Sequence, residues 1–257
     1  MTNYPIAAVK VSHDVLTVLA DRGDVGVTEV ATALSLPKST AHDHLRTLER
    51  VGSVVNENGR YRLSMQFLHF GKIARNNNEL FVRGRDEALG LSAAVGDSKY
   101  VQLVTEENGR CAVLLATRWQ RESLPPKATD VYPTHVPLHT NAPGKAILAS
   151  MDSETAERVL LEQGLERRTP ATITDEDELL SELERIRGNG YATDAGELIP
   201  GMTGVAAPIV TDADVHGAIA VYGATEEFES DRHDPPIADV VRDAADEIQA
   251  NLIFARD

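Results

Sequence analysis

One short segment limits the fold of this chain more than any other. Between residues 54 and 63, two runs of strand-forming residues are joined through Asn58-Gly59, and an Asn-Gly pair in this position is the strongest short-range signal for a β-hairpin. Alternation along the second run places Arg60 and Arg62 on the same face. The segment therefore predicts two antiparallel strands with an arginine-bearing face.

Three helices are predicted ahead of this hairpin. Apolar residues recur at helical spacing over 9–22, and a short second helix follows, for which Thr28 is the expected N-cap. The third covers 39–50, ends at Gly52 and has one apolar stripe. Its opposite face contains no apolar residue and consists of Ser39, Thr40, His42, Asp43, Arg46, Thr47 and Arg50.

This order of helices and hairpin is typical of a winged helix-turn-helix domain. A polar helix face can enter the major groove of DNA while the arginines of the hairpin approach phosphates or the adjacent minor groove. The alternative is a small helical interaction domain whose polar face is only solvated. We favour DNA binding, because the Pro37-Lys38-Ser39-Thr40 start of the third helix and the paired arginines occur together.

The net charge of −15 over 257 residues argues against nucleic acid when the chain is taken as a whole, because phosphate binding depends on Lys and Arg. The charge is uneven, however: residues 1–72 and 73–151 each carry a net +1, and residues 152–257 carry −17. The N-terminal segment is therefore compatible with DNA. Abundant Asp and Glu beside six Lys also indicate a high-salt cytoplasm; an ordinary acidic surface is the alternative.

The length predicts two domains, each with its own core. We place a winged helix-turn-helix domain at 1–64, a linker helix at 65–79 and an α/β domain at 80–257. The α/β domain is expected to contain, in order, a helix at 80–94, strands at 100–105 and 111–116, loop and edge strand in the Pro-rich stretch 124–143, helices at 144–150, 153–164 and 175–189, strands at 191–194, 205–210 and 216–222, and a helix at 236–254.

The sequence predicts a cytoplasmic protein with no membrane contact. No apolar run reaches about 18 residues, and the N-terminus lacks the charged and apolar regions of a signal peptide. The single cysteine, Cys111, excludes an intramolecular disulfide and fits a reducing compartment.

Several motifs occur along the chain in a recognisable order. They are Leu36-Pro37-Lys38-Ser39-Thr40-Ala41-His42, Leu45-Arg46-Thr47-Leu48, Tyr61-Arg62-Leu63, Leu138-His139, Gly144-Lys145-Ala146-Ile147-Leu148-Ala149, Gly190-Tyr191-Ala192 and Val205-Ala206-Ala207-Pro208. Together they resemble the IclR family of bacterial and archaeal transcription regulators, haloarchaeal-like in acidity. The resemblance implies an α+β protein: a winged helix-turn-helix domain, a linker helix used in dimerisation, and a GAF-like α/β effector-binding domain.

By this resemblance the chain is a ligand-responsive repressor or activator of a catabolic operon. It would bind a palindromic double-stranded DNA operator as a homodimer or a dimer of dimers. We assign base contacts to Ser39, Thr40, His42, Asp43 and Arg46, and phosphate or minor-groove contacts to Lys38, Arg50, Arg60 and Arg62. Asp43 departs from the family, which commonly has a basic residue there; it could accept from a cytosine amino group or form a salt bridge with Arg46.

The same resemblance implies a ligand pocket in the C-terminal domain. Its implied contacts are Asn141, Ala142, Pro143, Asp194, Gly204, Ala220 and Tyr222. We expect free backbone N–H groups at the start of the helix near Gly144 to meet the carboxylate of a small organic or sugar-derived acid. Asp194 is expected to accept from ligand hydroxyls, with capping of a local turn as its alternative role. No metal and no cofactor are expected.

Two other classes of function remain open: a GAF-like sensor without DNA binding, which the near-neutral N-terminal segment favours, and a small-molecule enzyme on the α/β domain. We do not expect an enzyme, because Gly144-Lys145 lacks the hydroxyl residue and upstream glycine of a phosphate-binding loop. Cys111 lies in an apolar strand pattern typical of a buried side chain. A structural metal near His135 and Cys111 is a further alternative.

Overall fold

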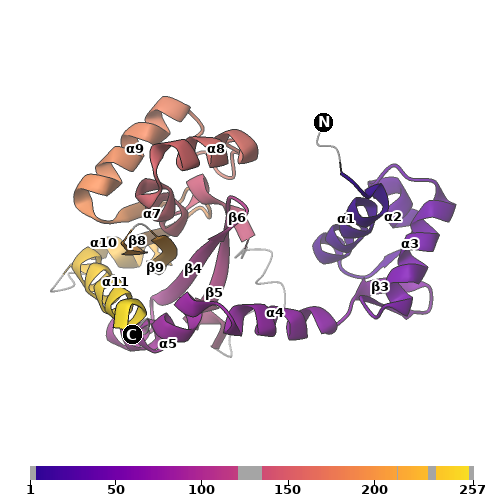
Figure 1. Ribbon diagram of the computed structural model, residues 1–257, viewed down its shortest axis with the longest axis horizontal. Coiled ribbons are helices and arrows are strands. Elements are labelled where there is room, and N and C mark those ends of the chain that lie inside the picture. The colour runs from indigo at the N-terminus through magenta and orange to yellow at the C-terminus, as the bar shows by residue number, and fades with distance from the viewer. Residues whose placement is uncertain (1–3, 121–134, 213, 231–235, 255–257) are drawn as a thin grey trace. The chain divides into compact units, whose positions relative to one another are not determined.

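The computed structural model describes residues 4–120, 135–212, 214–230 and 236–254. The chain divides into two compact units, Met1–Arg75 and Asn76–Asp257, and each is described by itself (Figure 1). Within the described ranges, none of the helices combines the length and apolar character needed to cross a membrane.

The N-terminal unit contains helices and a small three-stranded sheet, as predicted for a winged helix-turn-helix. Its elements are α1 (Ala7–Arg22), β1 (Val25–Gly26), α2 (Val27–Ala33), α3 (Lys38–Arg50), β2 (Val54–Glu57), β3 (Arg60–Leu63) and α4 (Gln66–Asn76). The strands are antiparallel in the order β1-β3-β2. Asn58 and Gly59 both have positive φ, 56° and 83°, which the tight turn of a two-residue hairpin requires. The predicted hairpin is therefore confirmed.

The start of α2 differs from the prediction. Its N-cap is Gly26 and not Thr28, and the carboxylate of Glu29 accepts the backbone N–H of Gly26 at 2.8 Å. The acidic side chain in the first turn of α2 thus satisfies a backbone donor that the helix itself leaves unpaired. Gly26 is also held in β1, which pairs with β3 and was too short to be predicted.

The core of the N-terminal unit joins its first three helices to the hairpin. Val15 and Leu19 of α1, Val30 of α2, Leu45 of α3 and Tyr61 of β3 are all buried in one cluster. The predicted apolar stripe of α3 is therefore confirmed as its inner face. Burial of this stripe fixes which face of α3 is left for solvent or a ligand.

Helix α4 buries none of its residues against the described chain. Phe67, Leu68, Phe70 and Ile73 are all exposed, as is Met65 just before the helix. Isolated exposed apolar residues are ordinary, but a continuous stripe on one helix marks an interaction surface.

The C-terminal unit is built around one antiparallel sheet with the order β6-β5-β4-β9-β8-β7. Its strands are β4 (Tyr100–Glu107), β5 (Arg110–Ala116), β6 (His135–Pro137), β7 (Ala192–Ala195), β8 (Met202–Thr211) and β9 (Asp214–Ala224), and its helices are α5 (Glu79–Ala94), α7 (Ala142–Ser150), α8 (Ser153–Gln163), α9 (Glu176–Asn189), α10 (Thr225–Ser230) and α11 (Ile237–Phe254), with short 3-10 turns η1 (Thr117–Gln120) and η2 (Leu138–Thr140). Helices α5 and α11 cover one face, and α7 to α9 lie on the other (Figure 1).

The predicted order of elements in this unit is confirmed, with ends that differ by a few residues. Helix α10 and the two 3-10 turns were not predicted, because segments of three to six residues carry too little periodicity. Strand β6 is an edge strand, as expected for the end of the Pro-rich stretch 124–143. The part of that prediction covering 124–134 lies outside the described residues.

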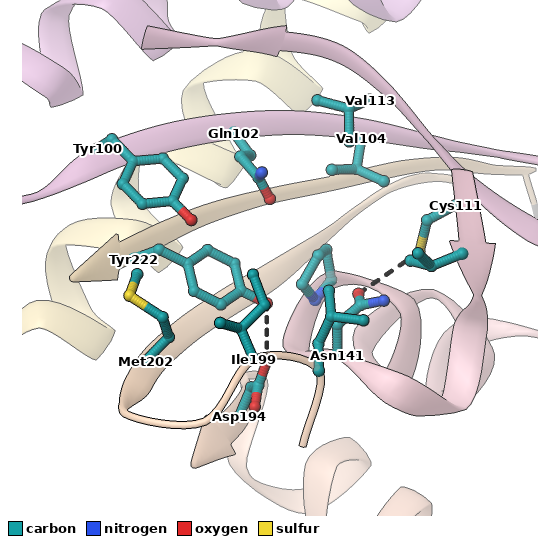
Figure 2. Close-up of a pocket in the computed structure, with 13 residues that line it drawn as sticks. Tyr100, Gln102, Val104, Cys111, Val113, Asn141, Asp194, Ile199, Met202 and Tyr222 are labelled. Carbon is teal, nitrogen blue, oxygen red and sulfur yellow. Dashed lines mark hydrogen bonds between the residues drawn. The ribbon is translucent and has the colours of Figure 1, made fainter. Parts of the chain in front are cut away.

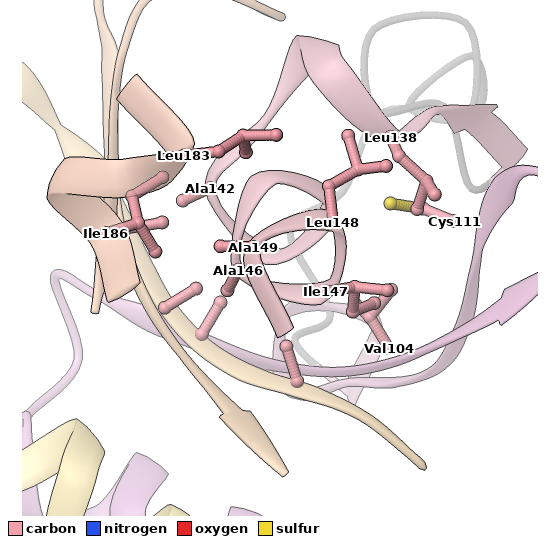
Figure 3. Packing of buried hydrophobic residues seen from close by; sticks show 14 of the residues in the cluster. Val104, Cys111, Leu138, Ala142, Ala146, Ile147, Leu148, Ala149, Leu183 and Ile186 are labelled. Atoms are coloured by element: carbon pink, nitrogen blue, oxygen red, sulfur yellow. The ribbon is translucent and has the colours of Figure 1, made fainter. Parts of the chain in front are cut away.

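Helix α7 is buried along almost its whole length and packs on the sheet amid the larger of the two apolar clusters (Figure 3). Small residues allow this close approach. A Cβ at Gly144 would lie 2.1 Å from the carbonyl oxygen of Leu138, so only glycine fits where α7 passes η2. This packing fixes the N-terminus of α7 beside β7 and β9.

Candidate functional site

The outer face of α3 carries the predicted DNA-contacting side chains together. Lys38, Ser39, His42, Asp43, Arg46 and Arg50 are exposed, and Thr40 is half-buried. Within the described part of the chain, Arg46 and Arg50 form no ion pair, so their guanidinium groups remain available to phosphates or base edges. A helix held from behind by its apolar stripe, with donors and acceptors on its front, has the construction of a recognition helix.

Of the two alternatives for Asp43, the salt bridge to Arg46 is not formed in the described chain. Asp43 Oδ1 lies 3.5 Å from His42 Nδ1, and its side chain is 80% exposed. The two neighbouring residues present a carboxylate acceptor beside an imidazole on the exposed face. Acceptance from a base amino group by Asp43 stays a prediction.

The arginines of the hairpin have partners within the unit. Arg60 Nε lies 3.2 Å from Asp24 Oδ2 and Nη1 lies 3.2 Å from Glu29 Oε2, while Arg62 Nη2 lies 2.5 Å from Glu57 Oε1. These groups are roughly half exposed and screened by solvent, so the pairs contribute little to stability. Their role as DNA contacts stays a prediction, and any phosphate has to compete with a carboxylate for them.

The second site is a pocket between the sheet and the start of α7 (Figure 2). It is lined by Tyr100, Gln102, Val104, Cys111, Val113, Val136, Asn141, Pro143, Asp194, Leu198, Ile199, Met202 and Tyr222. Four of the seven predicted ligand contacts, Asn141, Pro143, Asp194 and Tyr222, line it. The lining is mostly apolar, with amide, carboxyl and phenol groups at one end, which is the usual composition of a small-molecule site.

The other three predicted contacts lie behind the lining. Ala142 contributes its backbone N–H, Gly204 lies under the ring of Tyr222, and Ala220 is fully buried in the sheet beside Gln102. Sequence reasoning missed the residues of β4 and β5. Tyr100, Gln102 and Val104 alternate along one strand, which is a usable signal, but the face that meets α7 is decided by packing.

Tyr222 connects the polar groups of this pocket. Its hydroxyl donates to Asp194 Oδ2 at 3.2 Å and accepts the backbone N–H of Ala142 at 3.2 Å. Its ring stacks on Tyr100 with 5.7 Å between centroids. Burial raises the pKa of Tyr222 well above its ordinary value, so the phenol stays neutral and keeps its proton for Asp194.

The prediction of free N–H groups at the start of α7 is wrong. Asn141 is the N-cap and its Oδ1 accepts from Gly144 N at 2.8 Å, Ala142 N–H donates to Tyr222, and Lys145 N–H donates to the carbonyl of Asn141. Pro143 has no N–H. The helix start is therefore already satisfied by the chain, because asparagine is a strong N-cap and the phenol reaches the one remaining donor.

Asp194 has the capping role that was the alternative for it, and its role toward a ligand stays a prediction. Its Oδ1 caps the following turn by accepting Glu197 N at 2.7 Å, and its Oδ2 faces the pocket and Tyr222. Burial raises the pKa of Asp194 to about 7, an effect that the hydrogen bonds and Lys145 only partly offset. The carboxyl group can therefore change its charge near neutral pH.

A buried ion pair lies next to Asp194. Lys145, which is 1% exposed, places Nζ 2.5 Å from Glu197 Oε1 and 3.5 Å from Glu182 Oε1. The pair holds the loop after β7 against α7, and removal of one partner from such a pair strands a buried charge. Lys145 is thus occupied in packing rather than free to bind a phosphate or a carboxylate.

Two other side chains of reactive type, Cys111 and His139, are buried and hydrogen-bonded within the fold. The Cys111 thiol is buried and lies 3.5 Å from Asn141 Oδ1, and burial raises its pKa to about 12, so it is not a thiolate at neutral pH. His139 is buried and bonds the carbonyl of Glu166 at 3.0 Å. The described residues contain no group of three or more His, Cys, Asp or Glu arranged to hold a metal ion.

Comparison with known proteins accounts for both units. The IclR helix-turn-helix domain matches residues 8–57, and the C-terminal domain of the bacterial transcriptional regulator IclR matches residues 111–250. The chain belongs to the IclR family of DNA-binding transcription regulators. A relative from Halobacterium salinarum, named “Probable HTH-type transcriptional regulator ArcR”, is 30% identical over 251 residues, which are 96% of this chain and 94% of the relative.

Solved structures of the IclR family have the same fold. An IclR transcriptional regulator from Alicyclobacillus acidocaldarius has a TM-score of 0.73 and 26% identity, covering 97% of this chain and 100% of its own. An IclR homologue from Microbacterium hydrocarbonoxydans, solved with 4-hydroxybenzoate, has a TM-score of 0.73 and 23% identity, covering 96% and 99%. The predicted IclR fold, a winged helix-turn-helix followed by a GAF-like α/β domain, is confirmed.

Proposed function

We propose that this IclR-family regulator controls a catabolic operon in the cytoplasm of a halophile, and that it binds a palindromic operator under the control of a small organic or sugar-derived acid. The observation that carries the DNA-binding part is the exposed face of α3, where Arg46 and Arg50 lie beside Ser39 and His42 without an ion pair to any described residue. The acidic composition and the Halobacterium salinarum relative support the high-salt setting.

In this proposal the front of α3 reads bases and the positions around it bind the backbone. Base contacts fall to Ser39, Thr40, His42, Asp43 and Arg46, and phosphate contacts to Lys38, Arg50, Arg60 and Arg62. An arginine that reads a base changes sequence preference, whereas a phosphate contact changes affinity for all sequences alike.

The test is operator binding by the full chain in molar KCl, measured by fluorescence anisotropy on its own upstream DNA. Arg46→Ala should weaken operator binding by about tenfold to a hundredfold and relax sequence preference. The control is Arg85→Ala, which removes an exposed arginine from α5 in the other unit. Equal losses in both variants, or no loss in Arg46→Ala, would overturn the assignment of α3.

The effector pocket is the second part of the proposal. Its support is the pairing of an apolar lining with Asp194, Asn141 and Tyr222, and a neighbour of the same fold that holds 4-hydroxybenzoate, a hydroxylated acid. A ligand that binds only the folded state raises its melting temperature. Thermal-shift screening of the full chain against organic and sugar acids should therefore find stabilising ligands, and stabilisation by none would overturn this part.

The proposal includes a homodimer, or a dimer of dimers, and no enzymatic activity. Helix α4 supports the dimer, because its exposed apolar stripe has no partner within the described chain. The occupied Lys145 and the neutral thiol of Cys111 support the absence of catalysis. A sensor without DNA binding is the competing function, and no measurable affinity of the wild-type chain for its upstream DNA would favour it. Unchanged operator affinity in Arg60→Ala/Arg62→Ala would instead overturn the assignment of the hairpin arginines.

A further inference from the structure

Tyr222 occupies the polar end of the effector pocket with its own side chain. Its hydroxyl donates to Asp194 Oδ2 at 3.2 Å (Figure 2) and accepts from Ala142 N at 3.2 Å. It therefore takes up the first N–H of α7 and bonds one oxygen of the buried carboxyl group. While the phenol is there, the Ala142 N–H is occupied and the ring covers the side of Asp194 Oδ2 that faces the pocket.

The space left beside the ring is too small for an organic ligand. The cavity measures about 20 Å³, which is room for one water, whereas sites for drug-sized molecules enclose roughly 300 to 1,000 Å³. A molecule with a ring or a chain of several carbons can enter only if a lining side chain moves.

The place of the ring is built into the sheet. Gly204 lies directly opposite Tyr222 on β8, and a Cβ there would be 2.2 Å from Cε1 of the ring. The other side of the ring faces Tyr100. The ring therefore rests in a slot that exists only because residue 204 has no side chain.

We propose that Tyr222 occupies the ligand anchor, by which we mean the backbone N–H of Ala142 together with the carboxyl group of Asp194. An effector binds there by displacing the phenol and presenting a hydroxyl group of its own to Ala142 and Asp194. A hydroxyl accepts one hydrogen bond and donates another, as both contacts require. A carboxylate can accept from Ala142 but repels an ionised Asp194. The inference rests on the proposed effector function and narrows it to molecules, hydroxy acids among them, whose buried end is a hydroxyl.

The experiment removes the phenol of Tyr222 and supplies a free phenol molecule in its place. Tyr222→Ala in the full chain removes the atoms of phenol, and phenol, benzene and benzoate are titrated by calorimetry at pH 8, where Asp194 is mainly ionised. Phenol should bind about tenfold or more tightly than benzene, because only phenol supplies both hydrogen bonds. Benzoate should bind more weakly than phenol. Wild type should bind phenol about a hundredfold more weakly than the variant, because its own ring must leave first.

Two further variants control for packing. Tyr100→Ala opens a similar volume in the same pocket without uncovering Ala142 or Asp194, and should bind phenol and benzene within about threefold of each other. Tyr222→Phe keeps the ring but loses both hydrogen bonds, and should bind phenol about tenfold more tightly than wild type. This variant answers the question even if Tyr222→Ala fails to fold.

Several results would overturn the inference. Equal binding of phenol and benzene by Tyr222→Ala would show that the anchor does not take a hydroxyl, and tighter binding of benzoate would assign it to carboxylates. Wild-type affinity equal to that of both Tyr222 variants would show that the ring blocks nothing. Operator binding is measured separately, so failure of the proposed DNA-binding function leaves these titrations interpretable.

Discussion

At the scale of single residues, the effector pocket depends on a side chain that is absent. Gly204 leaves the slot into which Tyr222 fits, and Tyr222 in turn satisfies Ala142 and Asp194. An added methyl group at residue 204 must displace the ring or bend β8 away from β9. Packing in protein interiors is too dense to absorb an overlap of this size.

Gly204→Ala is therefore expected to lower the free energy of unfolding by about 1 to 3 kcal/mol, measured by urea denaturation. In a protein that already carries Tyr222→Ala, the same Gly204→Ala change should cost much less, because the clash needs both side chains. Gly90→Ala is the matched control, since a Cβ there meets nothing within 4 Å, and it should be neutral or slightly stabilising. A simple sum of the two single effects would contradict this account.

Asp194 makes stability depend on pH in an unusual direction. Its pKa rises from 3.8 in the unfolded chain to about 7 in the fold, so the stability it contributes is present below pH 4 and is lost as pH rises through 7. The loss amounts to about 4 kcal/mol. Asp194→Asn should remove it, leaving an unfolding free energy that falls less between pH 4 and 8.

Asp152 provides the control of opposite sign. It is an exposed N-cap whose pKa is lowered by the backbone N–H of Thr155, so it contributes stability above its unfolded pKa that is lost as pH falls. Asp152→Asn should lower the free energy of unfolding at neutral pH. It should leave the pH dependence of that free energy between pH 5 and 8 unchanged. If Asp194→Asn left that pH dependence unchanged too, the buried carboxyl group would not be its source.

At the scale of elements, the hairpin arginines have two competing uses. Arg62 is paired with Glu57 on the neighbouring strand, so a contact to a DNA phosphate has to replace this ion pair. Glu57→Gln frees Arg62 and removes a negative charge from the wing, and operator affinity should rise about twofold to tenfold. Asp21→Asn makes the same charge change at an exposed position of α1 and should have a smaller effect. Equal effects would show that only net charge matters there.

Helix α4 is the element whose role depends on a second chain. Phe70→Glu places a charge in its exposed apolar stripe, and a dimer held by that stripe should dissociate, as measured by sedimentation equilibrium. Leu161→Glu in α8 is the control, because it places the same charge on a side chain that is 87% exposed in the other unit. A Phe70→Glu variant that remains dimeric would exclude α4 as the interface.

Local signals explain which elements could be predicted. The apolar stripe of α3 and the Asn58-Gly59 turn are encoded by neighbouring residues, and both are confirmed. Strand β1 has two residues and exists only because Val25 pairs with Tyr61. The satisfied start of α7 depends on a contact between Ala142 and Tyr222, which are 80 residues apart. Chain pattern alone cannot indicate such a contact, because tertiary packing decides it.

At the scale of the whole molecule, the charge distribution sets how DNA binding should respond to salt. The acidic charge belongs to residues 152–257, and the N-terminal unit is nearly neutral. Of the four proposed phosphate contacts, Lys38 and Arg50 form no ion pair with a described residue, whereas Arg60 and Arg62 are paired with carboxylates. A dimer would therefore neutralise between four and eight phosphates, and the slope of log affinity against log salt should lie between about −4 and −7. A slope near −10 would show that many more phosphates are neutralised.

The position of Tyr222 also has a consequence for time. If the Tyr222 phenol must leave before an effector enters, association cannot proceed faster than the movement of this side chain out of the pocket. The observed rate of effector binding then levels off as effector concentration rises. The speed with which the regulator answers a metabolite would then be set by one aromatic side chain rather than by diffusion. Replacement of that side chain would change how quickly an operon responds without altering the DNA sequence it recognises.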